Sequence, residues 1–148
     1  HGMQDYSAVL RGVFAALRPG GRFVAEFGGY GNVAAIEQAL QAALATRGVQ
    51  AGSPWFFPAP DFYAAALIEH GFSVVAIEHF PRPTAQPGDI RAWLRTFGEL
   101  YLRHVPATEH EAVVDEVANS LRASLQHDDG SWFVDYVRLR FAAEKPAT

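Results

Sequence analysis

The sequence predicts an α/β fold, and three observations support this. A segment with helical spacing of apolar residues, 5–17, runs through a Pro-Gly-Gly turn into a short apolar strand, 22–27. That strand ends in a glycine-rich loop that leads into a second helix, and helix and strand patterns continue to the end of the chain. In such folds, binding residues gather beyond the carboxyl ends of the strands. The five helices and three strands expected here are few strands for so many helices, which indicates part of a larger sheet.

Composition limits the classes of protein that this chain can represent. Its 148 residues, 49% of them hydrophobic, are enough for one globular domain. The net charge of -4 gives no reason to expect a nucleic acid or an anionic membrane as partner. The sequence contains no cysteine, which excludes disulfides and thiolate metal sites and suits a cytoplasmic location. No apolar run approaches the roughly 20 residues of a membrane span.

The first elements follow from capping and turn residues. Asp5 is expected to cap the first helix, and the Pro-Gly-Gly turn after Leu17 ends it. Strand 22–27 is apolar apart from its ends, so we expect an interior strand that is covered on both faces. Asn32 is expected to cap a helix that runs to about Thr46.

The middle of the chain is rich in proline and aromatic residues. Residues 52–60 form an aromatic loop between prolines, and Pro60 suits the first turn of a helix that ends at 70–71. Residues 72–80 are β-rich and predict a second strand. Three prolines between residues 81 and 87 predict a break.

The last third of the chain predicts two helical stretches and a strand. Asp89 begins a helix whose apolar residues continue to Tyr101. Thr108 and Glu111 have the spacing of a capping box for the next helix. A turn at 128–130 leads into a long final strand, 132–143.

Five segments in sequence resemble one protein family. They resemble the C-terminal half of a class I S-adenosylmethionine-dependent methyltransferase, most like the trans-aconitate methyltransferase-type enzymes that act on small molecules. The segments are Leu17-Arg-Pro-Gly-Gly-Arg-Phe23, Glu26-Phe-Gly-Gly-Tyr-Gly-Asn32, Phe56-Phe-Pro58 with Phe62-Tyr63 and His70-Gly-Phe72, Trp93-Leu-Arg-Thr-Phe97, and Asp135-Tyr-Val-Arg-Leu-Arg-Phe-Ala142.

The resemblance implies a fold and an activity. Residues 1–148 would be the C-terminal portion of a partial Rossmann-like sheet, with strands in the order five, seven, six, the last strand antiparallel, and a helical insertion at about 88–126. The family's cofactor is S-adenosylmethionine, but its cofactor motifs would lie upstream of residue 1. No residue of this chain is therefore assigned to the cofactor, and the chain alone is expected to be inactive. A non-catalytic α/β module that binds itself or a partner remains the alternative.

Four candidate site residues lie at the exit of the first strand. Glu26 could position a ligand at the carboxyl edge of the sheet, or it could bind the backbone amides of the adjacent loop. Gly28 and Gly29 permit unusual backbone angles or a close approach. Asn32 is a possible ligand contact as well as a helix cap.

Three further candidates are implied farther along the chain. Trp55 could form the wall of a small-molecule pocket or cover the core beneath its loop. Trp93 and Arg95 belong to helices that lie over the substrate in the resembling family. Arg95, or Arg91, could then pair with a substrate carboxylate, although a solvated helix face explains both arginines equally well.

The histidines and the edge of the first strand bear on metal binding and on oligomeric state. The six histidines have no metal-ligand spacing, so no metal is expected. If the fourth strand of the family's sheet is missing, strand 22–27 has an open edge, and open apolar edges pair with other chains. We therefore expect a homodimer through the edge of strand 22–27, with a small molecule as the other partner.

Overall fold

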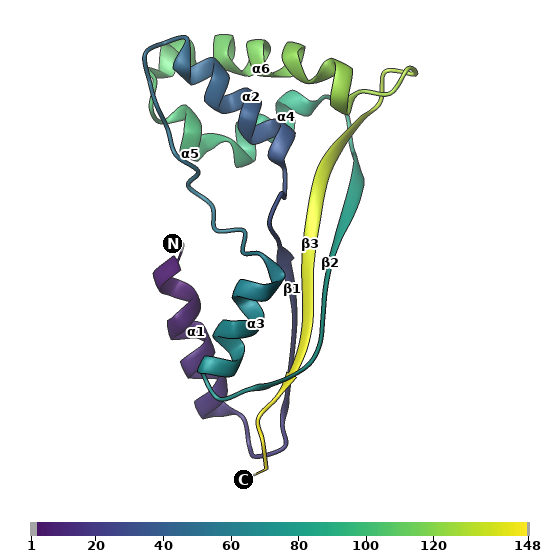
Figure 1. Ribbon diagram of the computed structural model, residues 1–148. Helices are drawn as coiled ribbons and strands as arrows, with labels where there is room; N and C mark the ends of the chain where they lie inside the picture. The colour runs from purple at the N-terminus through teal and green to yellow at the C-terminus, as the bar shows by residue number, and fades with distance from the viewer. Residues whose placement is uncertain (1–2, 148) are drawn as a thin grey trace. The chain divides into compact units, whose positions relative to one another are not determined.

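The computed structural model describes residues 3–147, without the side chains of residues 3 and 4, and confirms the predicted α/β class (Figure 1). The helices are α1 (Met3–Ala16), α2 (Ala34–Ala45), α3 (Pro60–Glu69), α4 (Ile90–Phe97), α5 (Glu99–Leu102) and α6 (His110–Leu125), with a short 3-10 helix, Ala107–Glu109, before α6. The strands are β1 (Arg22–Gly28), β2 (Ser73–Gln86) and β3 (Trp132–Glu144).

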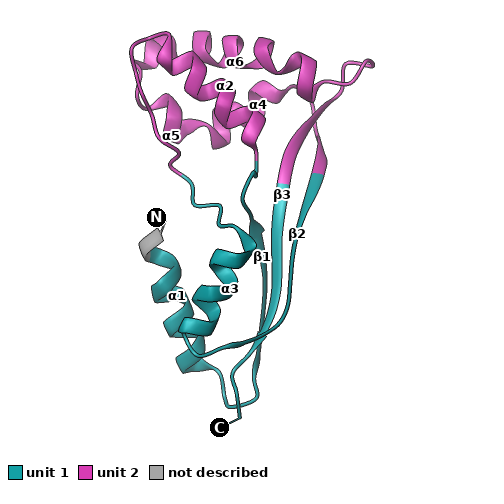
Figure 2. Ribbon diagram, in the orientation of Figure 1, with its two compact units in different colours: residues 1–32, 55–82, 137–148 teal, residues 33–54, 83–136 magenta. Residues whose placement is uncertain are grey.

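The chain divides into two compact units, which are described separately (Figure 2). Within the described residues, unit 1 comprises those up to 32, those at 55–82 and those from 137 onward. Unit 2 comprises residues 33–54 and 83–136, so the predicted insertion at 88–126 belongs to it together with α2. The boundary between the units falls within β2 and β3.

The three strands form one sheet in the order β1-β3-β2. β1 pairs antiparallel with β3, in a register that runs from Arg22 opposite Glu144 to Gly28 opposite Arg138. β2, like β1, runs against the central β3 (Figure 1). The predicted order, with the reversed final strand between the other two, is confirmed.

Unit 1 has its core on one face of this sheet. Residues from α1 and α3 pack there, Leu10 and Leu67 among them, together with Phe141 of β3. Phe23, Ala25 and Phe27 of β1 pack against this cluster as well. Successive side chains of a strand alternate between its faces, so Val24 points to the other face, where it is 60% exposed. The expectation that β1 is covered on both faces is therefore wrong for the described residues.

Unit 2 is a helical core built on the contact between α2 and α6. Their buried side chains include Leu40 and Leu44 of α2 and Val117 and Leu121 of α6. Tyr101 of α5 is fully buried and donates a hydrogen bond to the carboxylate of Glu37, which ties α5 to α2.

The predicted break at residues 81–87 is wrong, because β2 continues from Ser73 to Gln86 through Pro81 and Pro83. Proline cannot donate to a strand ladder, so it is confined mainly to edge strands. β2 is such a strand, since it pairs only with β3 among the described strands. The prolines are therefore compatible with a strand that the local pattern excluded.

Several predicted helix starts are also wrong. α1 begins at Met3, which places Asp5 inside its first turn instead of at its cap. α6 begins after a short 3-10 helix and has no side-chain cap, so the capping box of Thr108 and Glu111 does not form. The helix after Asp89 begins as predicted, with Asp89 Oδ1 accepting from the Arg91 N–H at 2.9 Å, but it ends at Gly98 instead of continuing to Tyr101.

Candidate functional site

The loop after β1 is held by its own backbone. The Gly29 N–H donates to the Val137 carbonyl at 3.0 Å, and the Tyr30 N–H donates to the Pro58 carbonyl at 3.0 Å. The Tyr30 carbonyl in turn lies 2.8 Å from His79 Nε2. These bonds fix the path of the chain between the end of β1 and Asn32.

Asn32 does not cap α2, which corrects the sequence prediction. The residue is 7% exposed, and its side-chain Oδ1 accepts from the Val137 N–H of β3 at 2.8 Å. The residue before α2 is Val33, in the left-handed conformation with φ of 49°, and it provides no side-chain cap. Asp135 Oδ2 instead accepts from the Ala35 N–H at 2.9 Å, which satisfies a free donor of the first turn.

Both candidate glycines lie in close contact with other protein groups. A Cβ at Gly28 would come within 2.6 Å of Asn32 Nδ2 and 2.9 Å of the Phe57 ring. A Cβ at Gly29 would come within 3.0 Å of the His79 ring. The close approach expected at these glycines is therefore made by side chains of this chain.

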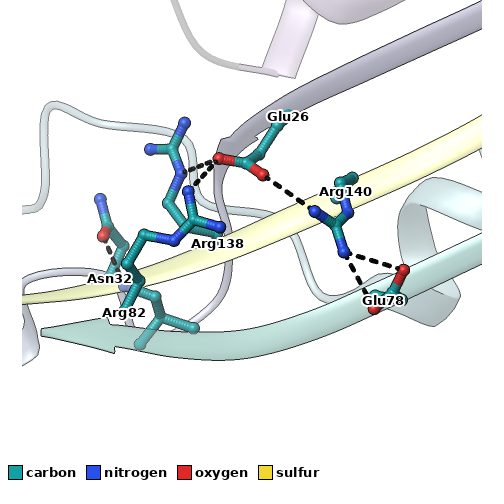
Figure 3. Close-up of polar contacts among 7 residues, drawn as sticks. Glu26, Asn32, Glu78, Arg82, Arg138 and Arg140 are labelled. Atoms are coloured by element: carbon teal, nitrogen blue, oxygen red, sulfur yellow. Dashed lines mark hydrogen bonds and ion pairs between the residues drawn. The ribbon is translucent and has the colours of Figure 1, made fainter.

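Glu26 lies at the centre of a cluster of arginines (Figure 3). Its Oε2 is 3.0 Å from Nη1 of Arg82 and 3.2 Å from Nε of Arg138, and its Oε1 is 3.9 Å from Nη1 of Arg140. Glu26 is thus held by side chains of β2 and β3, and the local backbone bonds that the sequence suggested are replaced by ion pairs.

The arginine cluster extends across the face of the sheet opposite the helices. Arg140 also pairs with both carboxylate oxygens of Glu78 at 3.2 Å. The guanidinium of Arg82 lies 5.1 Å from the centroid of the Phe80 ring, and that of Arg140 lies 5.2 Å from it. Three arginines against two glutamates give the cluster a net charge of +1.

The remaining candidates are divided between the units. In unit 1, Trp55 is half-buried, and its ring centroid lies 5.9 Å from that of Phe57. In unit 2, Trp93 is buried and its Nε1 donates to the Tyr136 hydroxyl at 2.9 Å. Arg95 is exposed and forms two hydrogen bonds to Glu111, at 2.8 and 3.0 Å, and these bonds hold the pKa of the Glu111 carboxyl below its ordinary value.

The structure therefore brings Glu26, Gly28, Gly29 and Asn32 together with side chains that the sequence did not single out. These are Arg138, Arg82 and His79. One signal was available: Arg138 and Arg140 are two residues apart in a predicted strand, which places both on one face. In the part of the chain that the structure describes, no group of three or more His, Asp or Glu side chains could hold a metal ion, and no helix is long and apolar enough to cross a membrane.

Comparison with known proteins finds similarity to methyltransferases. No protein-family model matches the sequence. The chain is 37% identical over 142 residues to an uncharacterized methyltransferase of Schizosaccharomyces pombe, an alignment that includes 93% of this chain. The chain is thus a relative of a protein named as a methyltransferase. It spans about half, 54%, of the length of that protein.

The fold of this methyltransferase relative also matches a solved structure. The crystal structure of a candidate methyltransferase from Bacillus halodurans C-125 aligns with a TM-score of 0.50 and covers 95% of this chain and 58% of its own. At 12% sequence identity this likeness shows the fold alone.

Most of the glycine-rich loop after β1 is engaged by groups of its own chain. A loop that cradles a ligand leaves backbone N–H groups and space over its glycines. Here the N–H groups of Gly29, Tyr30 and Asn32 all donate to carbonyls of this chain. Side chains fill the space over Gly28 and Gly29. We therefore assign no cofactor contact to this loop.

Proposed function

We propose that this chain is the substrate-side portion of an S-adenosylmethionine-dependent methyltransferase that acts on a small molecule, and that it is inactive by itself. The observation that carries the proposal is the 37% identity to a methyltransferase over nearly the whole chain. The reversed strand β3 between β1 and β2 is the geometry that the resemblance implied. The lack of cysteines supports a cytoplasmic location as part of the same proposal.

The chemistry of methyl transfer is consistent with the residues present. Transfer from a sulfonium requires alignment of the nucleophile, the methyl carbon and the leaving sulfur in a site that excludes water. An acceptor that is already ionised needs no general base. The arginines and the amide at the end of β1 could hold such an acceptor without an acid–base pair.

The test is methyl transfer by two forms of the protein. The 148-residue chain and the product of its gene, including any coding sequence upstream of residue 1, are incubated with methyl-labelled S-adenosylmethionine and a small-molecule extract. We expect label in the small-molecule fraction only in the reaction that contains the gene product, and none in the reaction with the 148-residue chain. Label in neither reaction contradicts the proposed activity, and equal label in both contradicts the inactivity of the chain alone.

A second candidate function is self-association through β1. β1 lies at the end of the sheet, and no described strand pairs with its outer edge. The Gly29 N–H and the Gly21 carbonyl both bond to β3 or its extension. Since these directions alternate along a strand, the N–H and C=O groups of Arg22, Val24 and Glu26 point to the outer edge.

Charge complementarity favours a second copy of the chain at this edge. In an antiparallel pair centred on Val24, Val24 faces Val24 of the second copy, and Arg22 faces its Glu26 on either side. Opposite charges placed directly across two strands contribute roughly 0.2–1 kcal/mol per pair. This register therefore places an apolar pair at the centre and residues of opposite charge directly across from one another on either side.

Sedimentation velocity tests the dimer. We expect the wild-type chain to sediment as a dimer and Val24→Lys as a monomer, because two lysines would face one another. Val75→Lys is the matched control, since Val75 is 51% exposed on β2, and it should remain dimeric. A wild-type monomer with rapid amide exchange at Val24 excludes this function.

A further inference from the structure

We propose that Asn32 and Arg138 form a binding site for the carboxylate group of a small molecule, at the carboxyl end of β1. This is a statement about binding, and it holds whether or not the chain takes part in methyl transfer. It rests on hydrogen-bond donors of these two side chains that nothing in the described residues engages.

The first donor is the side-chain amide of Asn32. The whole residue is 7% exposed, yet its Nδ2 has no acceptor among the residues that the structure describes. Among the described residues, Asp135 Oδ1 is the only polar side-chain atom that is both fully enclosed and without a hydrogen-bond partner. Asn32 Nδ2 also has no partner, so it is at least slightly exposed to solvent. A buried amide normally has its hydrogen bonds satisfied. An accessible but unpaired donor on a buried side chain is therefore suited to a ligand.

The orientation of this amide is fixed by its other end. Oδ1 accepts from the Val137 N–H at 2.8 Å, and of the two amide atoms only the oxygen can accept. The amide cannot exchange its oxygen and nitrogen without losing that bond. Asn32 therefore presents the same NH2 group at a constant position.

Gly28 and Phe57 shape the space beside the amide. A Cβ at Gly28 would lie 2.6 Å from Nδ2 and 2.9 Å from the Phe57 ring, so only glycine leaves the amide where it is. Side-chain alternation directs that position to the same face as Glu26. The amide thus lies beside an aromatic ring, at the end of the arginine cluster.

The second donor is the guanidinium of Arg138. Its Nε donates to Glu26 Oε2 at 3.2 Å, whereas its two terminal NH2 groups have no partner in the described residues. Its side chain is 27% exposed. The fork of NH2 groups on an arginine matches the two oxygens of a carboxylate.

The two donors lie within reach of one small ligand. Gly28 is directly opposite Arg138 in the sheet, and the Cβ atoms of opposed residues are about 5 Å apart. Because the Gly28 Cβ position is close to Asn32 Nδ2, that nitrogen lies within about 8 Å of the Arg138 Cβ. An extended arginine side chain covers most of this distance. Figure 3 shows Asn32 and Arg138 in the same group of polar side chains.

The local charge favours a carboxylate over a phosphate. Glu26 lies against Arg138, so the cluster has a net charge of only +1. A single carboxylate group balances that charge, and Glu26 repels the doubly charged phosphate group more strongly than it repels one carboxylate group. The planar guanidinium and amide groups also match a planar carboxylate.

The test uses the side-chain amide signals of the chain's two asparagines, Asn32 and Asn119. The 148-residue chain, labelled with ¹⁵N at asparagine, is titrated at pH 7 with acetate, succinate or inorganic phosphate at constant ionic strength. We expect a saturable shift of the Asn32 amide pair with acetate and succinate, and a smaller shift with phosphate. The Asn119 pair, which lies on an exposed position of α6, should not move.

Two variants separate binding from folding. Asn32→Asp keeps an oxygen for the Val137 N–H but replaces the donor by a charged acceptor, and Asn119→Asp makes the same charge change elsewhere. Succinate binding to both variants is followed by the shift of a backbone amide signal. We expect at least about tenfold weaker binding with Asn32→Asp and no change with Asn119→Asp. Arg138→Gln, at a partly exposed position, should also weaken binding.

Three results would overturn the proposal. They are equal shifts of both asparagine amides, a phosphate effect as large as that of acetate, and unchanged binding in both Asn32→Asp and Arg138→Gln.

Discussion

Replacement of Gly28 by alanine tests the packing of the candidate site. The added Cβ would lie 2.6 Å from Asn32 Nδ2 and 2.9 Å from the Phe57 ring, where ordinary van der Waals contacts begin at about 3.4 Å. Asn32 can move away only if its Oδ1 leaves the Val137 N–H. Gly28 is not among the glycines with positive φ, so the cost is steric and does not come from backbone strain.

The expected magnitude follows from two ways of relieving the clash. If the side chains stay in place, overpacking costs about 1–3 kcal/mol. If Asn32 swings away, a buried backbone donor loses its partner at a similar cost of about 1–3 kcal/mol. Only one of these has to be met, so Gly28→Ala should lower the free energy of unfolding by about 1–3 kcal/mol and Tm by roughly 3–12 °C.

Urea and thermal unfolding measure this change against a matched control. Gly12 lies within α1, and a Cβ there would have nothing within 4 Å. Gly12→Ala should therefore stabilise the protein by up to about 1 kcal/mol through helix propensity. In a double-mutant cycle, Asn32→Ala should relieve part of the cost of Gly28→Ala, with coupling of about 1 kcal/mol. A Gly28→Ala protein as stable as Gly12→Ala would refute this account of the packing.

Three other substitutions have defined outcomes. Lys145→Met should lower the free energy of unfolding in urea by about 1–3 kcal/mol, because Lys145 Nζ donates to two carbonyls near the end of α1 at 2.8 and 2.9 Å. Burial and the bond to Glu37 raise the pKa of Tyr101 above its ordinary 10.0. Above about pH 10 the tyrosine ionises first in the unfolded chain, so the free energy of unfolding should fall as pH rises. Tyr101→Phe should lose less of its free energy of unfolding than wild type in an alkaline titration. Burial also raises the pKa of Asp135 above 3.8, because it penalises the charged form in the folded state. Asp135→Asn should therefore be more stable than wild type at pH 7. This advantage should shrink toward pH 4, where the wild-type carboxyl becomes protonated in the folded state.

The strands were largely predictable because their signals are local. β1 is a short apolar run between two glycine turns, and β3 is a longer strand that begins after the turn at 128–130. The predicted bounds of both strands lie within about one residue of the observed ones. The predicted second strand, 72–80, stops before the end of β2, because Pro81 and Pro83 predict a break when only the local sequence is considered. The sequence does not state which strand will be at an edge, and only an edge strand tolerates these prolines.

The helix caps failed because partners distant in sequence replaced the local ones. Asn32 has the right chemistry for a cap, but its oxygen binds the Val137 N–H, 105 residues away. Glu111 has the right spacing for a capping box, but it pairs with Arg95 of α4 instead. Capping rules describe the options of a side chain within its own turn, and tertiary contacts decided between them.

The candidate site was predicted in part for the same reason. Glu26, Gly28 and Asn32 follow from their place at the end of a strand, and the structure brings them together. Their cationic neighbours could not be found by spacing, since Arg82 lies 56 residues and Arg138 lies 112 residues beyond Glu26. Arg82 was also hidden inside the stretch that the prolines marked as a break.

The central claim is that this chain contributes the sheet and its polar cluster and that S-adenosylmethionine is not held by this chain. Calorimetric titration of the 148-residue chain with S-adenosylmethionine tests this claim most directly. The account predicts no saturable heat with the 148-residue chain. A dissociation constant in the micromolar range for the chain alone would contradict it.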